Sequence, residues 1–188
     1  MMLTSPMDEN TVRNLKLGET VYLRGSIITG RDEMHMRALS SKEVPEELYG
    51  ATLFHCGPIM TERNGRTDVI AAGPTTSARM NSMGAEMIRR FGIRAIIGKG
   101  GMSDDVLKAM EETGCVYLAA IGGAAVSLAE GLNETIGVKW EDLGMAEAMW
   151  EFKADRFGPL IVAMDAHGNS IYKNVDKKVK EFVKGLQS

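Results

Sequence analysis

The stretch RAIIGKGGMSDDVLKAMEETGCVYLAAIGGAAVSLAEGL, residues 94–132, contains two short apolar runs that end in glycines, each followed by a helical pattern. In SDDVLKAMEETG the apolar residues recur at helical spacing, with Ser103 as the expected N-cap and Gly114 as the stop. Upstream, DVIAAG followed by TTSARMNSMGAEMIRRFG repeats the order of strand, glycine loop and helix. Three successive units of this kind predict parallel strands joined by crossover helices.

The flanking segments add further elements. ETVYLRGSIITG predicts a strand, DEMHMRALSS a short helix and TLFHCG, like DVIAAG, a buried strand. LIVAMDAHGNSIYKN predicts an antiparallel hairpin with a His-Gly-Asn turn, and VDKKVKEFVKGL a terminal helix. We therefore predict an α/β fold, a single domain with a mixed sheet over residues 1–188, in which residues 1–15 are loose or lie against a partner.

Composition excludes several classes of protein. The net charge of −3 lacks the basic excess of a nucleic-acid binder. No apolar run approaches the ~20 residues that span a bilayer, so we expect no membrane partner. The first residues have no apolar core of the kind a signal peptide needs, which favours a cytoplasmic location.

The two cysteines, Cys56 and Cys115, are isolated thiols in apolar stretches and are predicted to be buried without chemistry. A cubane iron–sulfur cluster takes three or four thiolates, so two cysteines cannot hold one. We expect no metal ligands in this chain, and any cluster must belong to a partner.

The loops after the predicted strands carry the candidate site. Three of them deliver a cation, namely Arg31, Arg79 and Lys99, beside glycines and hydroxyls. Arg79 is predicted in the first turn of its helix, where a cation opposes the helix dipole and so suggests anion binding. GKGG lacks the Ser or Thr that follows the lysine of a phosphate loop, so the nucleotide-binding pattern is not met. Arginine forks suit carboxylates, and a small dianion is the expected ligand.

Ordinary structural roles stay open for the same side chains. Arg31 and Asp32 could form a surface salt bridge, and Lys99 could be a solvated loop lysine. His35 has the position of a helix-surface histidine, and the other two histidines, His55 and His167, have structural positions. The methionines between residues 80 and 87 fit core packing better than a cofactor site.

Several motifs together resemble the β-subunit of class I iron–sulfur fumarases and the related L-tartrate dehydratases. The resemblance covers about residues 10–185 in unbroken order, and the combination of motifs is specific although no single one is. It rests on TGRDEMH (29–35), GPTTSARM (73–80), GKGGM (98–102), GGAA (122–125) and FGPLIVAMDAHGNSIY (157–172).

The resemblance implies a swivelling β/β/α domain that works with a larger α subunit. That partner would carry a [4Fe–4S] cluster held by three cysteines, whose fourth iron binds the substrate. The implied reaction is the reversible hydration of fumarate to malate, a step of the tricarboxylic acid cycle. An α2β2 assembly is expected, or a homodimer when this chain is isolated.

The resemblance also assigns residues by motif. The side chains that would face the dicarboxylate are Arg31, Thr75, Arg79 and Lys99. Thr75 would take the proton-transfer role with Lys99 as the second catalytic residue, while Asp32, His35 and Thr76 would lie behind them. The one departure is Glu33-Met34, where the family often has a pair of small residues before the histidine, and it is expected to alter only the helix surface.

Three alternatives remain. The first is an L-tartrate dehydratase β subunit, whose substrate differs from malate by one hydroxyl. The second is a stand-alone carboxylate-binding or phosphate-binding module without a cluster partner, and the third is a nucleotide-binding domain that uses the same glycine loops.

Overall fold

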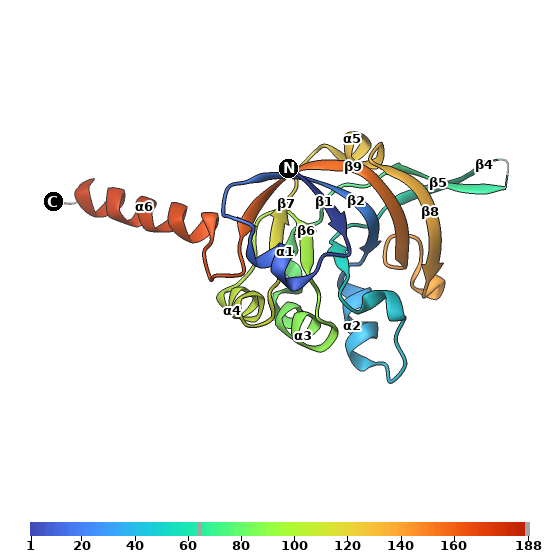
Figure 1. Ribbon diagram of the computed structural model, residues 1–188, viewed down its shortest axis with the longest axis horizontal. Coiled ribbons are helices and arrows are strands. Elements are labelled where there is room, and N and C mark those ends of the chain that lie inside the picture. Colours follow the sequence, from blue (N-terminus) through green and yellow to red (C-terminus); the bar gives the residue numbers. More distant parts are fainter. Residues whose placement is uncertain (64, 187–188) are drawn as a thin grey trace.

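Strand β9 (Met149–Met164) holds the main sheet together. It runs antiparallel to β2 (Thr20–Thr29), β7 (Val116–Ala119) and β8 (Leu132–Lys139). The sheet has the order β1-β2-β3-β6-β7-β9-β8, and the additional β2–β9 pairing closes it on itself. The computed structural model in Figure 1 describes residues 1–63 and 65–186.

The central strands are parallel. Strand β3 (Thr52–Phe54) lies between β2 and β6 (Ala95–Gly98), and β7 follows β6 in the same direction. The carboxyl ends of these four strands therefore lie at one edge of the sheet, where ligands bind in both open and closed sheets of parallel strands. The α/β class with a mixed sheet is confirmed.

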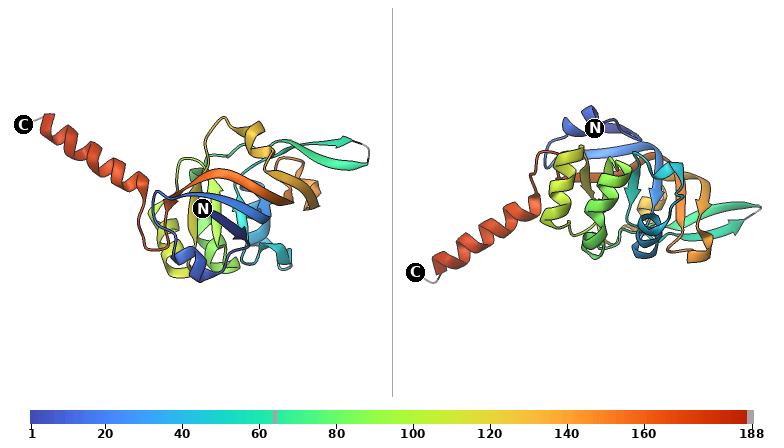
Figure 2. Two further views of the ribbon diagram at one scale, coloured as in Figure 1. Left: turned by 45° about the horizontal axis from the view of Figure 1, so that its top comes forward. Right: turned by 90° about the horizontal axis from the view of Figure 1, so that it is seen from below.

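Helices cover one face of the sheet. They are α2 (Asp32–Ser40), α3 (Asn81–Phe91) and α4 (Asp104–Thr113), which lie side by side along that face in the right-hand view of Figure 2. The last two end where predicted, at Gly92 and Gly114, which adopt the left-handed conformation at φ 61° and 73°. Ser103 occupies the predicted N-cap position of α4, but its side chain makes no capping hydrogen bond.

The apolar core is divided between the two faces of the sheet. Alternate residues of each strand point to opposite faces. Ile97 and Val116 pack with α1 (Glu9–Arg13) and α5 (Ala125–Ala129). Their neighbours Ile96 and Tyr117 pack against α2, α3 and α4. Because both faces are buried, the strands at the centre read as continuous apolar runs. The remaining short elements are α5 (Ala125–Ala129), η1 (Glu46–Leu48), η2 (Ser77–Met80) and η3 (Glu141–Leu143).

The N-terminal segment packs on the domain. Strand β1 (Met2–Ser5) pairs parallel with β2, and helix α1 (Glu9–Arg13) follows it. Val12 and Leu15 are buried in the core. Residues 1–15, for which the sequence predicted a loose or partner-bound arrangement, are thus ordered against their own chain.

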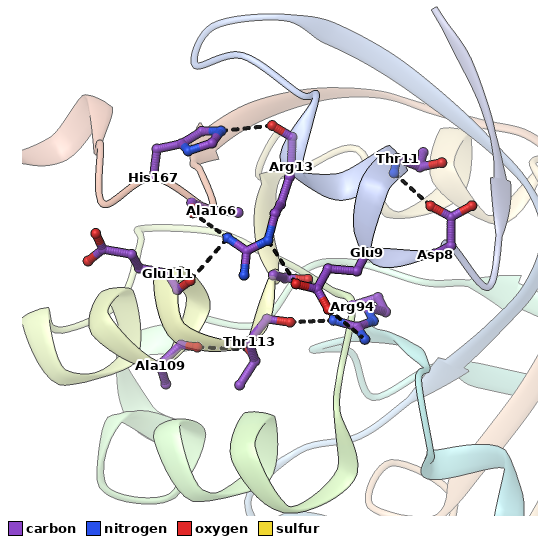
Figure 3. Close-up of polar contacts among 11 residues, drawn as sticks. Asp8, Glu9, Thr11, Arg13, Arg94, Ala109, Glu111, Thr113, Ala166 and His167 are labelled. Atoms are coloured by element: carbon purple, nitrogen blue, oxygen red, sulfur yellow. Dashed lines mark hydrogen bonds and ion pairs between the residues drawn. The ribbon is translucent and has the colours of Figure 1, made fainter.

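Arg13 ties α1 to two distant parts of the fold (Figure 3). Its guanidinium pairs with Glu9 at 2.8 Å and donates to the carbonyls of Glu111 and Ala166 at 3.2 and 3.3 Å. The ring Nε2 of His167 lies 2.7 Å from the Arg13 carbonyl. These contacts fix the turn that follows β9 against the N-terminal helix.

Two local predictions are wrong. DVIAAG lies partly in strand β5 (Arg66–Ala71), which is not one of the parallel strands of the main sheet. Among the described residues β5 pairs with β4 (Ile59–Arg63) in a separate two-stranded antiparallel sheet, which projects from the body (Figure 1). SIYKN is not a hairpin arm. It begins helix α6 (Ile171–Leu186), after a turn with a single bridge between Met164 and Ser170.

Helix α6 extends away from the rest of the molecule, as Figure 1 shows, and none of its described residues is buried. Its exposed side chains include Val175, Val179 and Phe182. Over the residues that the structure describes, we find no helix with the length and apolar character needed to cross a bilayer.

Candidate functional site

Two of the predicted site residues follow parallel strands, Arg31 after β2 and Lys99 after β6. Since β2, β3 and β6 run in the same direction, these two loops emerge at one edge of the sheet. Thr75 and Arg79 lie on the segment between β5 and α3, which backbone hydrogen bonds attach to the same edge.

The segment that contains Thr75 lies between the ends of β3 and β6. Its amide donates to the His55 carbonyl at 2.7 Å, and its own carbonyl accepts from the Lys99 amide at 3.3 Å. The Ser77 amide in turn donates to the Lys99 carbonyl at 3.0 Å, and Thr76 bridges Lys99 in parallel. Backbone hydrogen bonds therefore fix Thr75 and Lys99 relative to each other.

Arg31 is held by contacts that the sequence did not predict. Its Nε lies 3.1 Å from Oε1 of Glu147, a charge pair that is not a hydrogen bond. The side chain also crosses Gly57, where an added Cβ would lie 2.8 Å from Nη1 of Arg31. Arg31 does not pair with Asp32, so the predicted alternative of a local salt bridge is wrong.

Asp32 pairs instead with Arg79. Nη2 of Arg79 donates to Oδ2 of Asp32 at 2.7 Å, and half of the Arg79 side chain remains exposed. Arg79 lies in the 3-10 turn η2, just before α3, rather than in the first turn of the α-helix as predicted. The ion pair joins the TGRD loop to the GPTTSAR loop.

Lys99 is exposed, and no ion pair involves it within the described residues. Its Cδ lies 3.8 Å from the position of a Cβ added at Gly122, so the side chain extends beside the loop that follows β7. A bulky residue at position 122 would crowd it. Of the three cations, Lys99 is thus the one whose charge is not balanced by a carboxylate among those residues.

His35 is fully buried, which corrects the prediction of a helix-surface histidine. Its ring lies 5.1 Å from that of His55, centroid to centroid, in an edge arrangement. Burial lowers the pKa of His35 to about 4, against the opposing effects of the Arg31 carbonyl and the Asp32 charge. Burial also lowers the pKa of His55 well below its usual range. Both rings are therefore neutral at neutral pH.

The structure adds residues that the motifs did not predict. Glu147 lies 116 positions after Arg31, and nothing in its local sequence indicates that the two side chains meet. Ser77 and Tyr117 form buried hydrogen bonds beneath the loops, at 2.8 Å from Nδ1 of His55 to Oγ of Ser77 and 2.9 Å from the Tyr117 hydroxyl to the same oxygen. Tyr117 lies in an apolar strand, which gave no sign of its polar role, and Ser77 was one of several hydroxyls in its loop.

The cysteines are buried, as predicted. Burial raises the pKa of the Cys56 thiol to about 12 and raises that of Cys115 as well. Metal-binding thiolates need the opposite shift. Within residues 1–63 and 65–186, no three His, Cys, Asp or Glu side chains gather as they would around a metal ion.

Comparison with known proteins identifies the family. The family model described as fumarase C-terminus matches residues 1–175. A putative L(+)-tartrate dehydratase subunit beta from Methanocaldococcus jannaschii is 47% identical over 180 residues, which is 93% of this chain and 92% of that protein. The L(+)-tartrate dehydratase subunit beta of Escherichia coli K12 is 36% identical over 176 residues, 90% of this chain and 85% of that protein.

A third relative is longer. A putative class I fumarate hydratase from Geobacillus stearothermophilus is 42% identical over 180 residues, which is 95% of this chain but 35% of that protein. The same unit therefore occurs both as a separate subunit and as part of a larger chain. With the family model and these relatives covering nearly all of its length, the chain belongs to the fumarase C-terminus family, in which its relatives are named tartrate dehydratase β subunits and class I fumarate hydratase.

Proposed function

We propose that this chain is the smaller subunit of a hydro-lyase that reversibly hydrates fumarate to malate, and that Arg31, Arg79 and Lys99 bind the dicarboxylate. The observation that carries the proposal is the contact between the three loops. The Asp32–Arg79 ion pair joins the first loop to the second, and the Thr75–Lys99 backbone hydrogen bond joins the second to the third. Family membership supports the same reaction class.

The chemistry explains why such a site needs cations. To remove water from malate, a proton must leave the carbon beside a carboxylate, and that carbon is a very weak acid. The resulting negative charge spreads onto the carboxylate, so fixed cations stabilise the transition state more than the ground state. Arg79 and Arg31 can each grip a carboxylate with two N–H groups, and Lys99 adds a compact charge.

Thr75 is the proposed proton-transfer residue. The N–H and C=O groups of its backbone are hydrogen-bonded to His55 and Lys99, so the position of its Cα at the site is fixed. A threonine hydroxyl is a poor base, and neighbouring cations would have to lower its pKa. The proximity of Lys99 to Thr75 supports this assignment, with Lys99 as the second catalytic residue.

Without substrate, two of the three cations of the site are paired with carboxylates of this chain. Glu147 lies beside Arg31 and Asp32 beside Arg79, so two of the three cations face a carboxylate of this chain. A substrate carboxylate can share the unused N–H groups of each guanidinium, which has five donors. Thr76, exposed beside Lys99, would border the bound acid.

An iron–sulfur cluster does not fit the residues of this chain. A cubane takes three or four thiolates, and the two cysteines present are buried with raised pKa values. We infer that a larger α subunit holds the [4Fe–4S] cluster through three cysteines, and that this chain contributes binding and proton transfer. An α2β2 assembly in the cytoplasm is part of the same proposal.

L(+)-tartrate is a second candidate substrate. The two relatives whose length this chain nearly matches are both named tartrate dehydratase subunit beta. Tartrate presents the same pair of carboxylates with one further hydroxyl, so the cation site would accept either acid. The residues that distinguish them would then lie near that extra hydroxyl.

The test is an assay of the complex with its larger subunit, prepared anaerobically and supplied with fumarate, malate and both tartrates. Turnover of malate and fumarate supports the first candidate, and turnover of L(+)-tartrate alone supports the second. If no larger subunit co-purifies and calorimetry shows that the chain binds phosphate or ATP in preference to fumarate, a stand-alone binding module replaces the hydro-lyase. Light scattering on the same sample gives the stoichiometry.

A further inference from the structure

A line of buried hydrogen bonds runs beneath the site loops, starting at Tyr117 in strand β7. The Tyr117 hydroxyl donates to Oγ of Ser77 at 2.9 Å, and Oγ lies 2.8 Å from Nδ1 of His55. Ser77, Tyr117 and His55 are all fully buried, so no bulk water competes for these bonds.

Beyond the contact between the His55 and His35 rings, a further hydrogen bond joins His35 to the Arg31 backbone. Nδ1 of His35 lies 2.7 Å from the carbonyl oxygen of Arg31. The two rings are 5.1 Å apart, centroid to centroid, at an interplanar angle of 63°. The Nε2 atom of each ring is buried and has no hydrogen-bond partner within the described residues. Buried polar atoms of this kind are rare, and two on neighbouring rings call for a common explanation.

The partners determine which nitrogen of each ring carries the proton. A carbonyl oxygen can only accept, so Nδ1 of His35 must donate to Arg31, which leaves a lone pair on its Nε2. With the Tyr117 hydrogen directed to Ser77, we assign the Ser77 hydrogen to Nδ1 of His55, which places the His55 proton on Nε2. In this assignment the two Nε2 atoms are complementary, one donor and one acceptor, as a direct or water-bridged contact between the rings would require.

We propose that His35 and His55 are positioning residues of the dianion site, which join the loops of Lys99, Thr75 and Arg31 through one directional chain of hydrogen bonds. The series of bonds runs from Tyr117 through Ser77, whose amide also donates to the Lys99 carbonyl, to the two rings, and it ends at the Arg31 backbone. It therefore passes beneath each loop that supplies a cation. This inference rests on the proposed function for its kinetic consequence but not for its geometry.

Two glycines in the lysine loop make room for neighbouring side chains. A Cβ at Gly98 would overlap Oγ of Ser77 and lie 3.0 Å from the Tyr117 hydroxyl. Gly101, at φ 74°, has a backbone conformation that other residues rarely adopt, and a Cβ there would lie 2.5 Å from the Tyr172 ring. Packing therefore accounts for Gly98 and Gly101 without any phosphate ligand.

The protonated nitrogens can be read directly by nitrogen-15 NMR of the full chain labelled at histidine. The sequence has three histidines, and a His167→Gln variant identifies the third signal. We expect His35 to be protonated at Nδ1 and His55 at Nε2 at neutral pH. Ser77→Ala should shift the His55 proton between its two nitrogens and leave His35 unchanged. The same tautomer in both rings, or a His55 signal that is unchanged in Ser77→Ala, would contradict the proposed series of hydrogen bonds.

Steady-state kinetics test the positioning role in variants of the two-subunit complex that each lack one hydroxyl. Ser77→Ala and Tyr117→Phe should lower kcat/KM for the substrate by on the order of 100-fold. A loss of this size corresponds to a displacement of the substrate-binding side chains by about 1 Å. Tyr172→Phe is the matched control, since that ring packs 6.4 Å from Tyr117 but lies outside the chain. Wild-type kinetics in Ser77→Ala, together with a changed His55 tautomer, contradict a positioning role. If the wild-type complex turns over none of the four acids, the proposed function fails. The histidine tautomers then still test the series of hydrogen bonds independently.

Discussion

Asp32 and Arg79 are 47 positions apart in the sequence and meet through a 2.7 Å hydrogen bond between charged groups. Half of the Arg79 side chain is exposed, so the pair contributes little to the free energy of unfolding, about 0–1 kcal/mol. The importance of the pair is geometric. Asp32, in the loop of Arg31, orients the guanidinium of Arg79.

Arg79→Ala should therefore affect catalysis far more than stability. Loss of one preorganised charge raises the barrier by about 2–4 kcal/mol, whereas the melting temperature should change little. Steady-state kinetics of the two-subunit complex and a thermal melt check the two effects. Arg79→Lys is the control that keeps the charge and loses the fork. A decrease in kcat/KM of less than about tenfold in Arg79→Ala would remove this residue from direct substrate contact.

Thr75→Ala should abolish most turnover while KM changes little, because the hydroxyl is proposed to move a proton rather than to hold the substrate. Thr75→Ser keeps the hydroxyl and should retain much of kcat. The comparison requires only kcat and KM for the two variants. Near-normal turnover in Thr75→Ala would assign proton transfer to another group.

Gly98→Ala should destabilise the protein, because the new methyl group would overlap Ser77 and crowd Tyr117. Overpacking of this kind costs about 1–3 kcal/mol in the free energy of unfolding. Gly137→Ala, in strand β8, is the matched control, since its Cβ would meet no atom within 4 Å. Urea unfolding of both variants checks the prediction, and equal stabilities would mean that the loop adjusts freely around Ser77.

The buried histidines predict acid sensitivity. Burial holds the pKa of His35 at about 4 rather than its ordinary 6.5, so between these values the unfolded chain binds a proton that the folded chain does not. Stability should then fall as the pH decreases from about 6.5 to about 4, by on the order of 3 kcal/mol from this residue. Urea unfolding at several pH values, compared with His35→Gln, measures the contribution. An unchanged slope in the variant contradicts the assignment.

Sequence patterns predicted the parts of the fold that are locally determined. The strands at residues 95–98 and 116–119, and the helix ends at Gly92 and Gly114, follow from apolar spacing and glycine conformation. DVIAAG was assigned to the wrong sheet because an apolar run does not reveal its pairing partner. The apolar and aromatic side chains of Ile171 and Tyr172 predict a strand in SIYKN, whereas these residues begin α6.

The candidate site shows the same limit. Motifs indicate Arg31, Thr75, Arg79 and Lys99. The common direction of β2 and β6 brings the loops of Arg31 and Lys99 to one edge, and backbone hydrogen bonds attach the Thr75 segment there. The ion pair of Arg31 with Glu147 depends on the chain returning after 116 positions, which no local pattern encodes. The burial of His35 likewise depends on how α2 packs against its neighbours.

The most direct test is a crystal structure of the two-subunit complex with malate or tartrate bound. The account predicts that Arg31, Arg79 and Lys99 each place a nitrogen on the order of 3 Å from a carboxylate oxygen of one and the same molecule. A dicarboxylate bound at another surface, or these three side chains directed to separate faces of the chain, would contradict the proposed dianion site.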